Sequence, residues 1–293
     1  MSPTVSKGVR RAIGVLLALA AAGLGGKLMM DAMVRQMLYP APPVRVPSPP
    51  PAPLVEVPLA AGGQAVSAWW LPPEASGSAP APASEAAAAP VVLMLHGNGE
   101  NLETMRQAGL FEDFHATGAG VLAIDYPGYG RSPGTPSEEA NVAAAEAAWG
   151  WLRANAGGRP AVVAGWSLGA GVAAQLAARH SGETAGVILL SAWDRLEEVA
   201  RRHFPGWMVS ALLAERYDSA AIAPQIAAPV LMVHGERDAI IPVTLGRRLF
   251  EALPGPDKRW VEVRGAGHND LLAGREPWEA IAAFLRERAA PSL

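Results

Sequence analysis

The chain has 293 residues, of which half are apolar and 17% are charged, and its formal net charge at pH 7 is −3. This length and apolar content suffice for one large domain around a buried sheet, and without a basic excess we expect no nucleic-acid partner. The chain contains no cysteine, which excludes disulfides, thiolate catalysis and cysteine-ligated metals.

Residues 1–36 carry the pattern of a membrane anchor or an export signal. Three basic residues (Lys7, Arg10 and Arg11) precede an apolar run over Ala12–Gly26. The run is short for a span of about 20 residues, but Lys27 can place its ammonium group at the interface and let the span continue. More apolar residues follow, which favours an uncleaved anchor over a cleaved signal; a cytosolic helix is the remaining alternative. Positive charge at the N-terminal side predicts that the domain lies outside the cytoplasm, on the periplasmic side of a bacterial inner membrane.

Residues 37–53 are predicted to form a proline-rich spacer. Ala41–Pro53 reads A-P-P-V-R-V-P-S-P-P-P-A-P, and proline at this density favours an extended polyproline-type chain. The segment can be interpreted equally well as a tether between the membrane and the following domain or as a strap on the domain surface. Farther on, Ala75–Ala89 is rich in Ala, Ser and Pro, which is typical of a surface loop.

Residues 54–293 alternate between strand and helix patterns. Two strands joined by a glycine turn are expected over Leu54–Leu59 and Val66–Leu71. Further strands are predicted at Val91–Leu95, Gly120–Ile124, Ala161–Ala164, Val187–Leu190, Val230–Val233 and Trp260–Val263. Helical patterns lie at about Leu102–His115, Glu138–Asn155, Leu168–Arg179, Leu245–Leu253 and Pro277–Arg286. The alternation predicts an α/β domain with a mostly parallel sheet, helices on both faces, and reactive groups at the carboxyl ends of the strands.

The loop after Val91–Leu95 reads His96-Gly97-Asn98-Gly99. Its glycines let the backbone of Asn98 turn inward, where its amide is expected to serve as one oxyanion donor. His96 is then interpreted as a structural residue beneath the site. The later stretch Asp125–Ser132 reads as a tight turn in which Asp125 bonds local amides.

Gly165-Trp166-Ser167-Leu168-Gly169 lies between a predicted strand and a predicted helix. In that context the G-x-S-x-G pattern indicates a nucleophilic serine on a strained turn, with glycines where strand and helix pass too close for side chains. The amide of Leu168, at the helix N-terminus, is the second predicted oxyanion donor. A simple serine N-cap is the alternative interpretation.

One connection, residues 193–228, is longer than a crossover between two strands requires. Its apolar residues predict a small helical cap above the strand ends. Four of them are assigned to a substrate pocket: Trp193, Phe204, Trp207 and Met208. An apolar cap favours an apolar acyl group, and its small size predicts a shallow pocket for short or medium chains. Alternatively, these residues only pack the cap onto the domain.

A serine hydroxyl needs a base, and His268 fits that role best among the six histidines. It lies in a glycine-containing loop after the last predicted strand. Asp238, directly past the preceding strand, is predicted as the acid that orients His268 and stabilises its charged form. Asp194 is the rival acid, whereas Asp218 reads as a helix N-cap.

Taken in order, these motifs resemble the membrane-anchored branch of the α/β-hydrolase-domain proteins, the group that includes protein depalmitoylases. The resemblance runs from about Met37 to the C-terminus. It rests on Gly97-Asn98-Gly99, Asp125–Ser132, Gly-Trp-Ser167-Leu-Gly, Tyr217-Asp218-Ser219, Val-His-Gly-Glu-Arg-Asp238 and Gly-Ala-Gly-His268. It implies an α/β-hydrolase fold with a triad of Ser167, Asp238 and His268.

Motifs and resemblance together predict a serine hydrolase that cleaves carboxylic esters or thioesters through an acyl-enzyme. A serine aminopeptidase of the same fold is the alternative, because the cap carries carboxylates that suit a substrate amine: Asp194, Glu197, Glu198 and Glu215. A non-catalytic module of this fold is disfavoured, since all three triad residues are present. The expected partners are a small-molecule or acylated substrate and, through residues 1–36, a membrane; no metal or other cofactor is expected.

Overall fold

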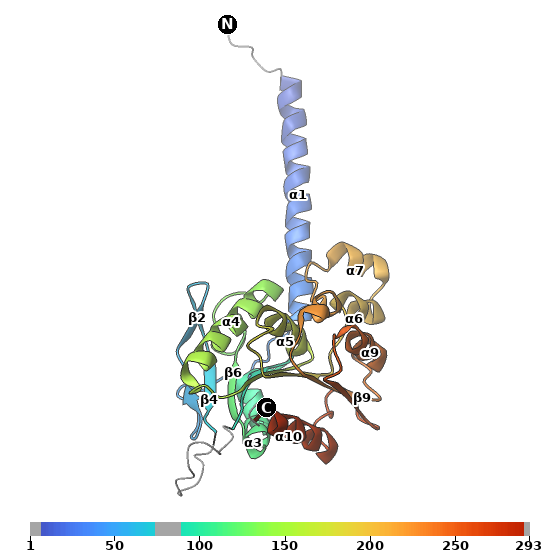
Figure 1. Ribbon diagram of the computed structural model, residues 1–293. Helices are drawn as coiled ribbons and strands as arrows, with labels where there is room; N and C mark the ends of the chain where they lie inside the picture. Colours follow the sequence, from blue (N-terminus) through green and yellow to red (C-terminus); the bar gives the residue numbers. More distant parts are fainter. Residues whose placement is uncertain (1–6, 74–88, 290–293) are drawn as a thin grey trace, which may run out of the picture.

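A mostly parallel sheet forms the centre of the protein (Figure 1). The structure, a computed structural model, describes residues 7–73 and 89–289, with the backbone alone for residues 7–22. In this part the sheet order is β1-β4-β6-β5-β7-β8-β9-β10. The strands are β1 (Val55–Glu56), β4 (Ala68–Leu71), β5 (Val91–Leu95), β6 (Gly120–Ile124), β7 (Ala161–Trp166), β8 (Gly186–Leu190), β9 (Val230–Gly235) and β10 (Lys258–Val263). Within this sheet, as far as the structure describes the chain, the β1–β4 and β4–β6 pairs are antiparallel and the others are parallel. The predicted fold class is confirmed.

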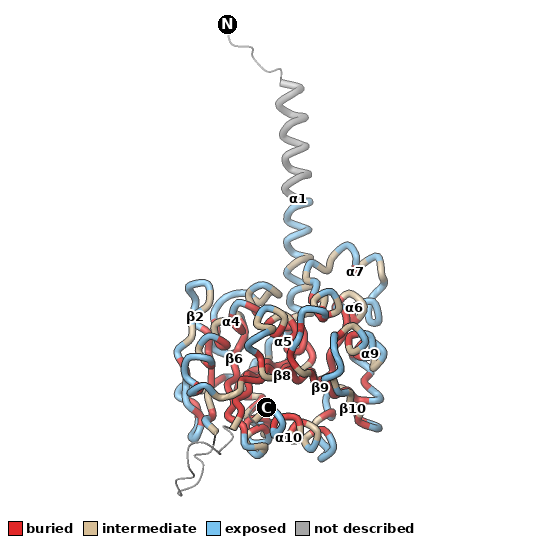
Figure 2. The backbone as a smooth tube through the Cα atoms, viewed as in Figure 1, coloured by how far each residue is buried: buried red, intermediate tan, exposed pale blue. Residues whose placement is uncertain are grey.

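Helices cover both faces of the sheet, which explains why β5, β6 and β8 are buried at every residue. On one face lie α4 (Glu138–Asn155), α5 (Leu168–Arg179) and α9 (Val243–Ala252). On the other lie α2 (Leu102–Gln107), α3 (Leu110–Ala116) and α10 (Arg275–Ala289). The buried residues follow the sheet through the middle of the domain (Figure 2). Strands buried on both faces are expected in parallel sheets of this kind.

The structure differs from the predicted elements at one helix and at the first pair of strands. The helix expected over Leu102–His115 is interrupted at Gly109, which has a φ of 80° and begins α3. The first expected strand pair instead supplies β1 and β4 to the main sheet and, between them, the hairpin of β2 (Leu59–Ala61) and β3 (Gln64–Val66). Positive φ values are readily adopted by glycine, so the break at Gly109 follows from backbone chemistry. The glycine turn itself is present at Gly62-Gly63, between β2 and β3.

The predicted cap consists of α6 (Leu196–His203), α7 (Gly206–Leu212), α8 (Ser219–Ile222) and the 3₁₀ turn η1 (Ala223–Gln225). Leu196, Val199 and Val209 are buried and hold α6 and α7 to the domain. Asp218 accepts a hydrogen bond from the Ala221 amide at 3.1 Å and therefore caps α8, as its position predicted.

The proline-rich segment is a strap on the domain surface. Tyr39 and Val46 are buried, and the carbonyl of Val44 accepts a hydrogen bond from Asn101 Nδ2 at 2.8 Å. The hydroxyls of Tyr39 and Tyr217 lie 3.2 Å apart in the interior. These contacts fix the C-terminal end of the long helix α1 (Lys7–Leu38), which projects away from the domain (Figure 1).

Part of the sequence pattern falls outside the described residues. The side chains of residues 12–22, most of the apolar run Ala12–Gly26, belong to that part, as do residues 75–88 of the Ala-rich stretch. Among the residues that are described, no helix combines the length and apolar character needed to cross a membrane.

Candidate active site

Ser167 lies on a sharp turn between β7 and α5, with φ 55° and ψ −115°. This is a costly backbone conformation for a residue other than glycine. A Cβ atom at Gly165 would overlap the carbonyl of Gly169, and one at Gly169 would overlap the carbonyl of Leu95. The strand and the helix are thus close enough to require both glycines, as the pentapeptide predicted.

His268 and Asp238 are joined by a hydrogen bond between Nδ1 and Oδ2 of 2.7 Å. The other carboxylate oxygen, Oδ1, accepts from the amides of Ile240 at 3.0 Å and Ile241 at 2.7 Å. Burial raises the pKa of Asp238, but the hydrogen bond and charge of His268 and the Ile241 amide outweigh it and leave the pKa below its ordinary value. The carboxylate is therefore charged and fixed in orientation at neutral pH.

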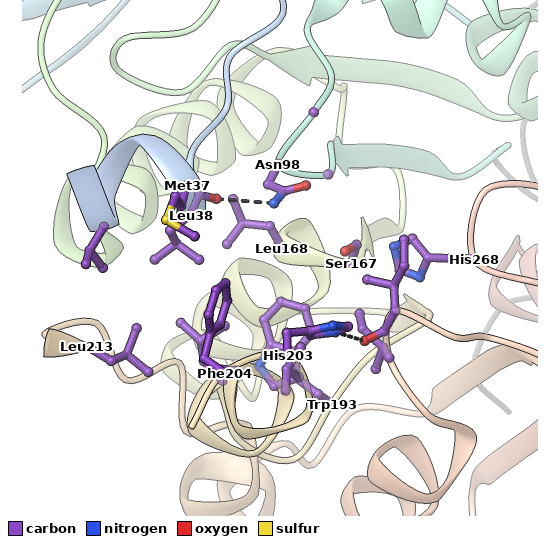
Figure 3. A pocket seen from close by; sticks show the side chains of 18 of the residues that line it. Met37, Leu38, Asn98, Ser167, Leu168, Trp193, His203, Phe204, Leu213 and His268 are labelled. Carbon is purple, nitrogen blue, oxygen red and sulfur yellow. Dashed lines mark hydrogen bonds between the residues drawn. The ribbon is translucent and has the colours of Figure 1, made fainter. Parts of the chain in front are cut away.

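Ser167 and His268 line the same cavity (Figure 3). The ring centroids of His268 and Trp166, the neighbour of Ser167, are 6.5 Å apart. Ser167 is 9% exposed and the side chain of His268 is 10% exposed, so both are largely shielded from solvent. The fold therefore brings together the three side chains that the sequence predicted as a triad.

The rival acid, Asp194, has a different partner. Its Oδ2 lies 2.6 Å from Nε of Arg248 on α9. Arg248 also contacts Glu198 of α6 at 3.3 Å. Asp194 therefore links the cap to α9, and Asp238 is the carboxylate that His268 contacts.

The loop carrying Asn98 is held next to Ser167 by hydrogen bonds on several sides. The amide of Gly97 donates to Glu100 Oε2 at 2.7 Å, the carbonyl of Asn98 accepts from Tyr129 Oη at 2.8 Å, and Asn98 Nδ2 donates to the carbonyl of Leu38 at 3.2 Å. A Cβ at Gly97 would lie only 3.7 Å from Cβ of Ser167. Within the described part of the chain, the amides of Asn98 and Leu168 have no protein acceptor.

Glu100 is a site residue that sequence reasoning missed. Glu100 lines the cavity. Burial raises its pKa above the ordinary value, although the hydrogen bond from the Gly97 amide and the charge of His268 act to lower that pKa. The available signal was a carboxylate three residues after Gly97 in the loop that follows β5, a spacing that allows a side chain to accept a hydrogen bond within its own turn.

His96 and Asp125 lie beneath the site and are fully buried. His96 packs against Tyr126 and Tyr129, with ring centroids at 4.3 and 5.2 Å, and burial lowers its pKa to about 4. Burial also raises the pKa of Asp125 to about 6. Oδ1 of Asp125 accepts from the amide of Leu102 at the start of α2 at 2.9 Å, and Oδ2 accepts from the amide of Arg131 at 3.5 Å, so Asp125 bonds α2 as well as its own turn.

The cavity has a volume of about 550 Å³. Of the four predicted pocket residues, Trp193, Phe204 and Met208 line it and Trp207 does not. Trp207 is 73% exposed, because consecutive side chains of α7 point in different directions and Met208 takes the inward one. The sequence also missed one wall entirely: residues of α1 line the cavity opposite the cap.

Comparisons with known proteins agree with this architecture. The family model described as "alpha/beta hydrolase fold" matches residues 90–215, and one described as "TAP-like protein" matches residues 207–292. An uncharacterized protein from Mycobacterium tuberculosis is 36% identical over 292 residues, covering 95% of this chain and 96% of its own length. The lysophosphatidylserine lipase ABHD12 of Danio rerio is 30% identical over 178 residues, which are 55% of this chain and 47% of the lipase.

Among solved structures, an esterase from Pyrococcus furiosus superposes with a TM-score of 0.67. The match covers 85% of this chain and 98% of the esterase, at 20% sequence identity. Sheet order, the turn at Ser167 and the relatives all lead to the same assignment: the chain belongs to the α/β-hydrolase family.

Proposed function

We propose that the protein is a serine hydrolase that cleaves carboxylic esters or thioesters of apolar acyl groups. The observation that carries this proposal is the 2.7 Å bond between His268 and Asp238 in the cavity that also contains Ser167 on its strained turn. Such a constellation of serine, base and orienting acid is recognised by geometry and roles.

In the proposed reaction, Ser167 Oγ attacks the carbonyl carbon and its proton passes to Nε2 of His268. The amides of Asn98 and Leu168 donate hydrogen bonds to the oxyanion. The C–O or C–S bond then breaks, and His268 returns the proton to the leaving alcohol or thiol. Water, deprotonated by His268, hydrolyses the acyl-enzyme and restores Ser167. Asp238 keeps Nδ1 protonated and stabilises the imidazolium throughout.

The engagement of the cap carboxylates favours an ester over an N-terminal peptide as substrate. Asp194 and Glu198 contact Arg248, Glu197 pairs with Arg201 at 2.6 Å, and Glu215 accepts from the Glu138 amide. None of these four lines the cavity. An aminopeptidase needs a carboxylate for the substrate amine, whereas these groups are occupied elsewhere. The names of the lipase and esterase relatives support the same choice.

We also propose that residues 1–36 anchor the protein in a bacterial inner membrane with the domain on the periplasmic side. The support is the basic segment before the apolar run. Membrane fractions should retain the full chain after carbonate extraction, and reporter fusions after Pro53 should behave as exported. A reporter active only in the cytoplasm would overturn this orientation.

The catalytic proposal is tested with Ser167→Ala and a matched control, Ser210→Ala, in the full chain. Ser210 lies on α7 and is exposed. The wild type and the Ser210 variant should react with a fluorophosphonate probe and hydrolyse p-nitrophenyl acetate, and the Ser167 variant should do neither. Labelling of the Ser167 variant at the wild-type rate would refute the assignment.

A further inference from the structure

The C-terminal end of α1 is one wall of the catalytic cavity. Met30, Met33, Val34, Met37 and Leu38 all line it, across from the cap helices (Figure 3). This end of α1 is fixed to the site, because the carbonyl of Leu38 accepts the 3.2 Å hydrogen bond from Asn98. The helix α1, most of which lies within the predicted anchor (residues 1–36), is thus directly connected to the loop beside Ser167.

The cavity is polar at one end and apolar at the other. Asn98, Glu100 and His268 gather near Ser167, whereas the space between α1 and the cap is bounded by aliphatic, thioether and aromatic side chains, among them Met33, Met37, Phe204, Met208 and Leu212. An ester carbonyl at Ser167 therefore places its acyl chain between α1 and α7. Because α1 extends the cavity beyond the cap, the shallow pocket expected from the cap alone is deepened.

The same end of the molecule carries the exposed apolar surface. In the described part of the chain, every large exposed apolar side chain except Val55 lies on α1, at or between the cap helices, or at Ile240. Met33 is 57% exposed, Phe204 40% and Trp207 73%. Apolar side chains that border a cavity mouth and include an exposed tryptophan suit contact with lipid, since tryptophan favours the boundary between apolar chains and water.

We propose that the substrate is an acyl lipid whose chain passes from a lipid surface into the cavity between α1 and α7, and that Met33 and Met37 of α1 set the accepted chain length. This inference rests on the proposed hydrolase function and names its substrate class. Trp207, which does not line the cavity, contacts the lipid surface beside the opening. The helix α1 in this way contributes both to the substrate site and to the proposed attachment of the protein to the membrane.

The chain-length role is tested with Met37→Trp in the full chain, and with Met29→Trp as the matched control. Both residues are methionines on α1, but Met29 is 72% exposed and does not line the cavity. The ratio of kcat/KM for p-nitrophenyl dodecanoate to that for the acetate should fall roughly tenfold in the Met37 variant, as expected when about two methylenes lose their contacts. The Met29 variant should keep the wild-type ratio.

If the dodecanoate-to-acetate ratio were equal in the wild type and both variants, the proposal that α1 sets the accepted chain length would be wrong. If Met37→Trp does not fold, the same measurement is made with Met33→Trp, which alters the cavity wall one helical turn farther from Ser167. The dodecanoate-to-acetate ratio should then fall in that variant. Failure of the hydrolase proposal is seen separately, because acetate turnover would then persist in Ser167→Ala.

The lipid route is tested by reconstituting the full chain in phosphatidylglycerol vesicles. The acetate reaches the site from water, whereas the dodecanoate dissolves in the bilayer. Trp207→Gln should lower the dodecanoate-to-acetate ratio severalfold, and Trp207→Phe should restore most of it, because phenylalanine keeps an apolar ring at the surface. An unchanged ratio in the glutamine variant would overturn uptake from the lipid surface.

Discussion

Nδ1 of His268 lies 2.7 Å from Oδ2 of Asp238, although the two residues belong to loops after different strands, β10 and β9. The parallel register of these neighbouring strands places both loops at the same edge of the sheet. The Ile240 and Ile241 amides hold the carboxylate from the opposite side. The imidazole is therefore oriented by a fixed, charged group.

Asp238→Asn should lower kcat for p-nitrophenyl acetate by about 10³- to 10⁴-fold, because an amide favours the wrong histidine tautomer. Asp194→Asn is the control. Its carboxylate contacts Arg248 and not His268. This variant should therefore lower the melting temperature and leave kcat nearly unchanged. If Asp194→Asn were the more damaging change for kcat, the acid would have been assigned wrongly.

Glu100 is expected to position the loop that carries Asn98. In Glu100→Ala the Gly97 amide loses its acceptor, so the Asn98 amide should become poorly placed and kcat should fall by about 10- to 100-fold, less than complete loss of an oxyanion donor costs. Glu100→Gln keeps an oxygen for the Gly97 amide and should retain most of kcat. Equal losses in both variants would point to a role for the negative charge instead.

The glycines around Ser167 should tolerate no side chain. Gly169→Ala places a methyl group on the Leu95 carbonyl and should lower the free energy of unfolding by about 2 kcal/mol or more. Gly150→Ala, in the exposed middle of α4 with open space at its Cβ, should raise it by about 1 kcal/mol. Urea unfolding in detergent measures both changes, and similar signs for the two variants would contradict the close approach of β5, β7 and α5.

The shifted pKa values of His96 and Asp125 predict two opposite effects of pH on the free energy of unfolding. From pH 4 to 6.5 the unfolded chain protonates His96 and the folded protein does not, so this residue makes stability rise with pH. From pH 3.8 to 6 the folded protein holds a proton on Asp125 that the unfolded chain has lost, so this residue makes stability fall with pH. The two contributions, roughly 3 kcal/mol each, nearly cancel.

Asp125→Asn should therefore reveal the His96 contribution. The melting temperature of this variant should rise more steeply between pH 4 and 6.5 than that of the wild type. Nε2 of His96 lies 4.0 Å from Oδ1 of Asp125, so loss of the carboxylate also removes an adjacent negative charge and should favour neutral His96 further, in the same direction. Parallel curves would show that Asp125 titrates in the folded protein as it does in the unfolded chain.

Local sequence determined much of the fold and the candidate triad. The strands β5 and β6 and the helices α4 and α5 have the predicted bounds, because continuous apolar runs and helical periodicity need no distant partner to be recognised. Ser167, Asp238 and His268 were predicted in the same way, since each lies in the segment that follows a strand and parallel strands bring such segments to one edge of the sheet. The glycines of the pentapeptide also followed from local sterics.

Tertiary structure decided what depends on contacts between distant segments. The proline-rich segment fits a tether and a strap equally well as a sequence, and the burial of Tyr39 and Val46 against the domain selects the strap. Asp194 and Asp238 were both plausible acids until Arg248 and His268 were placed beside them. The cavity wall contributed by α1 could not be predicted from the sequence, because its methionines are as suitable for a membrane anchor as for a cavity wall. Only the packing of α1 against the Asn98 loop shows that they line the cavity.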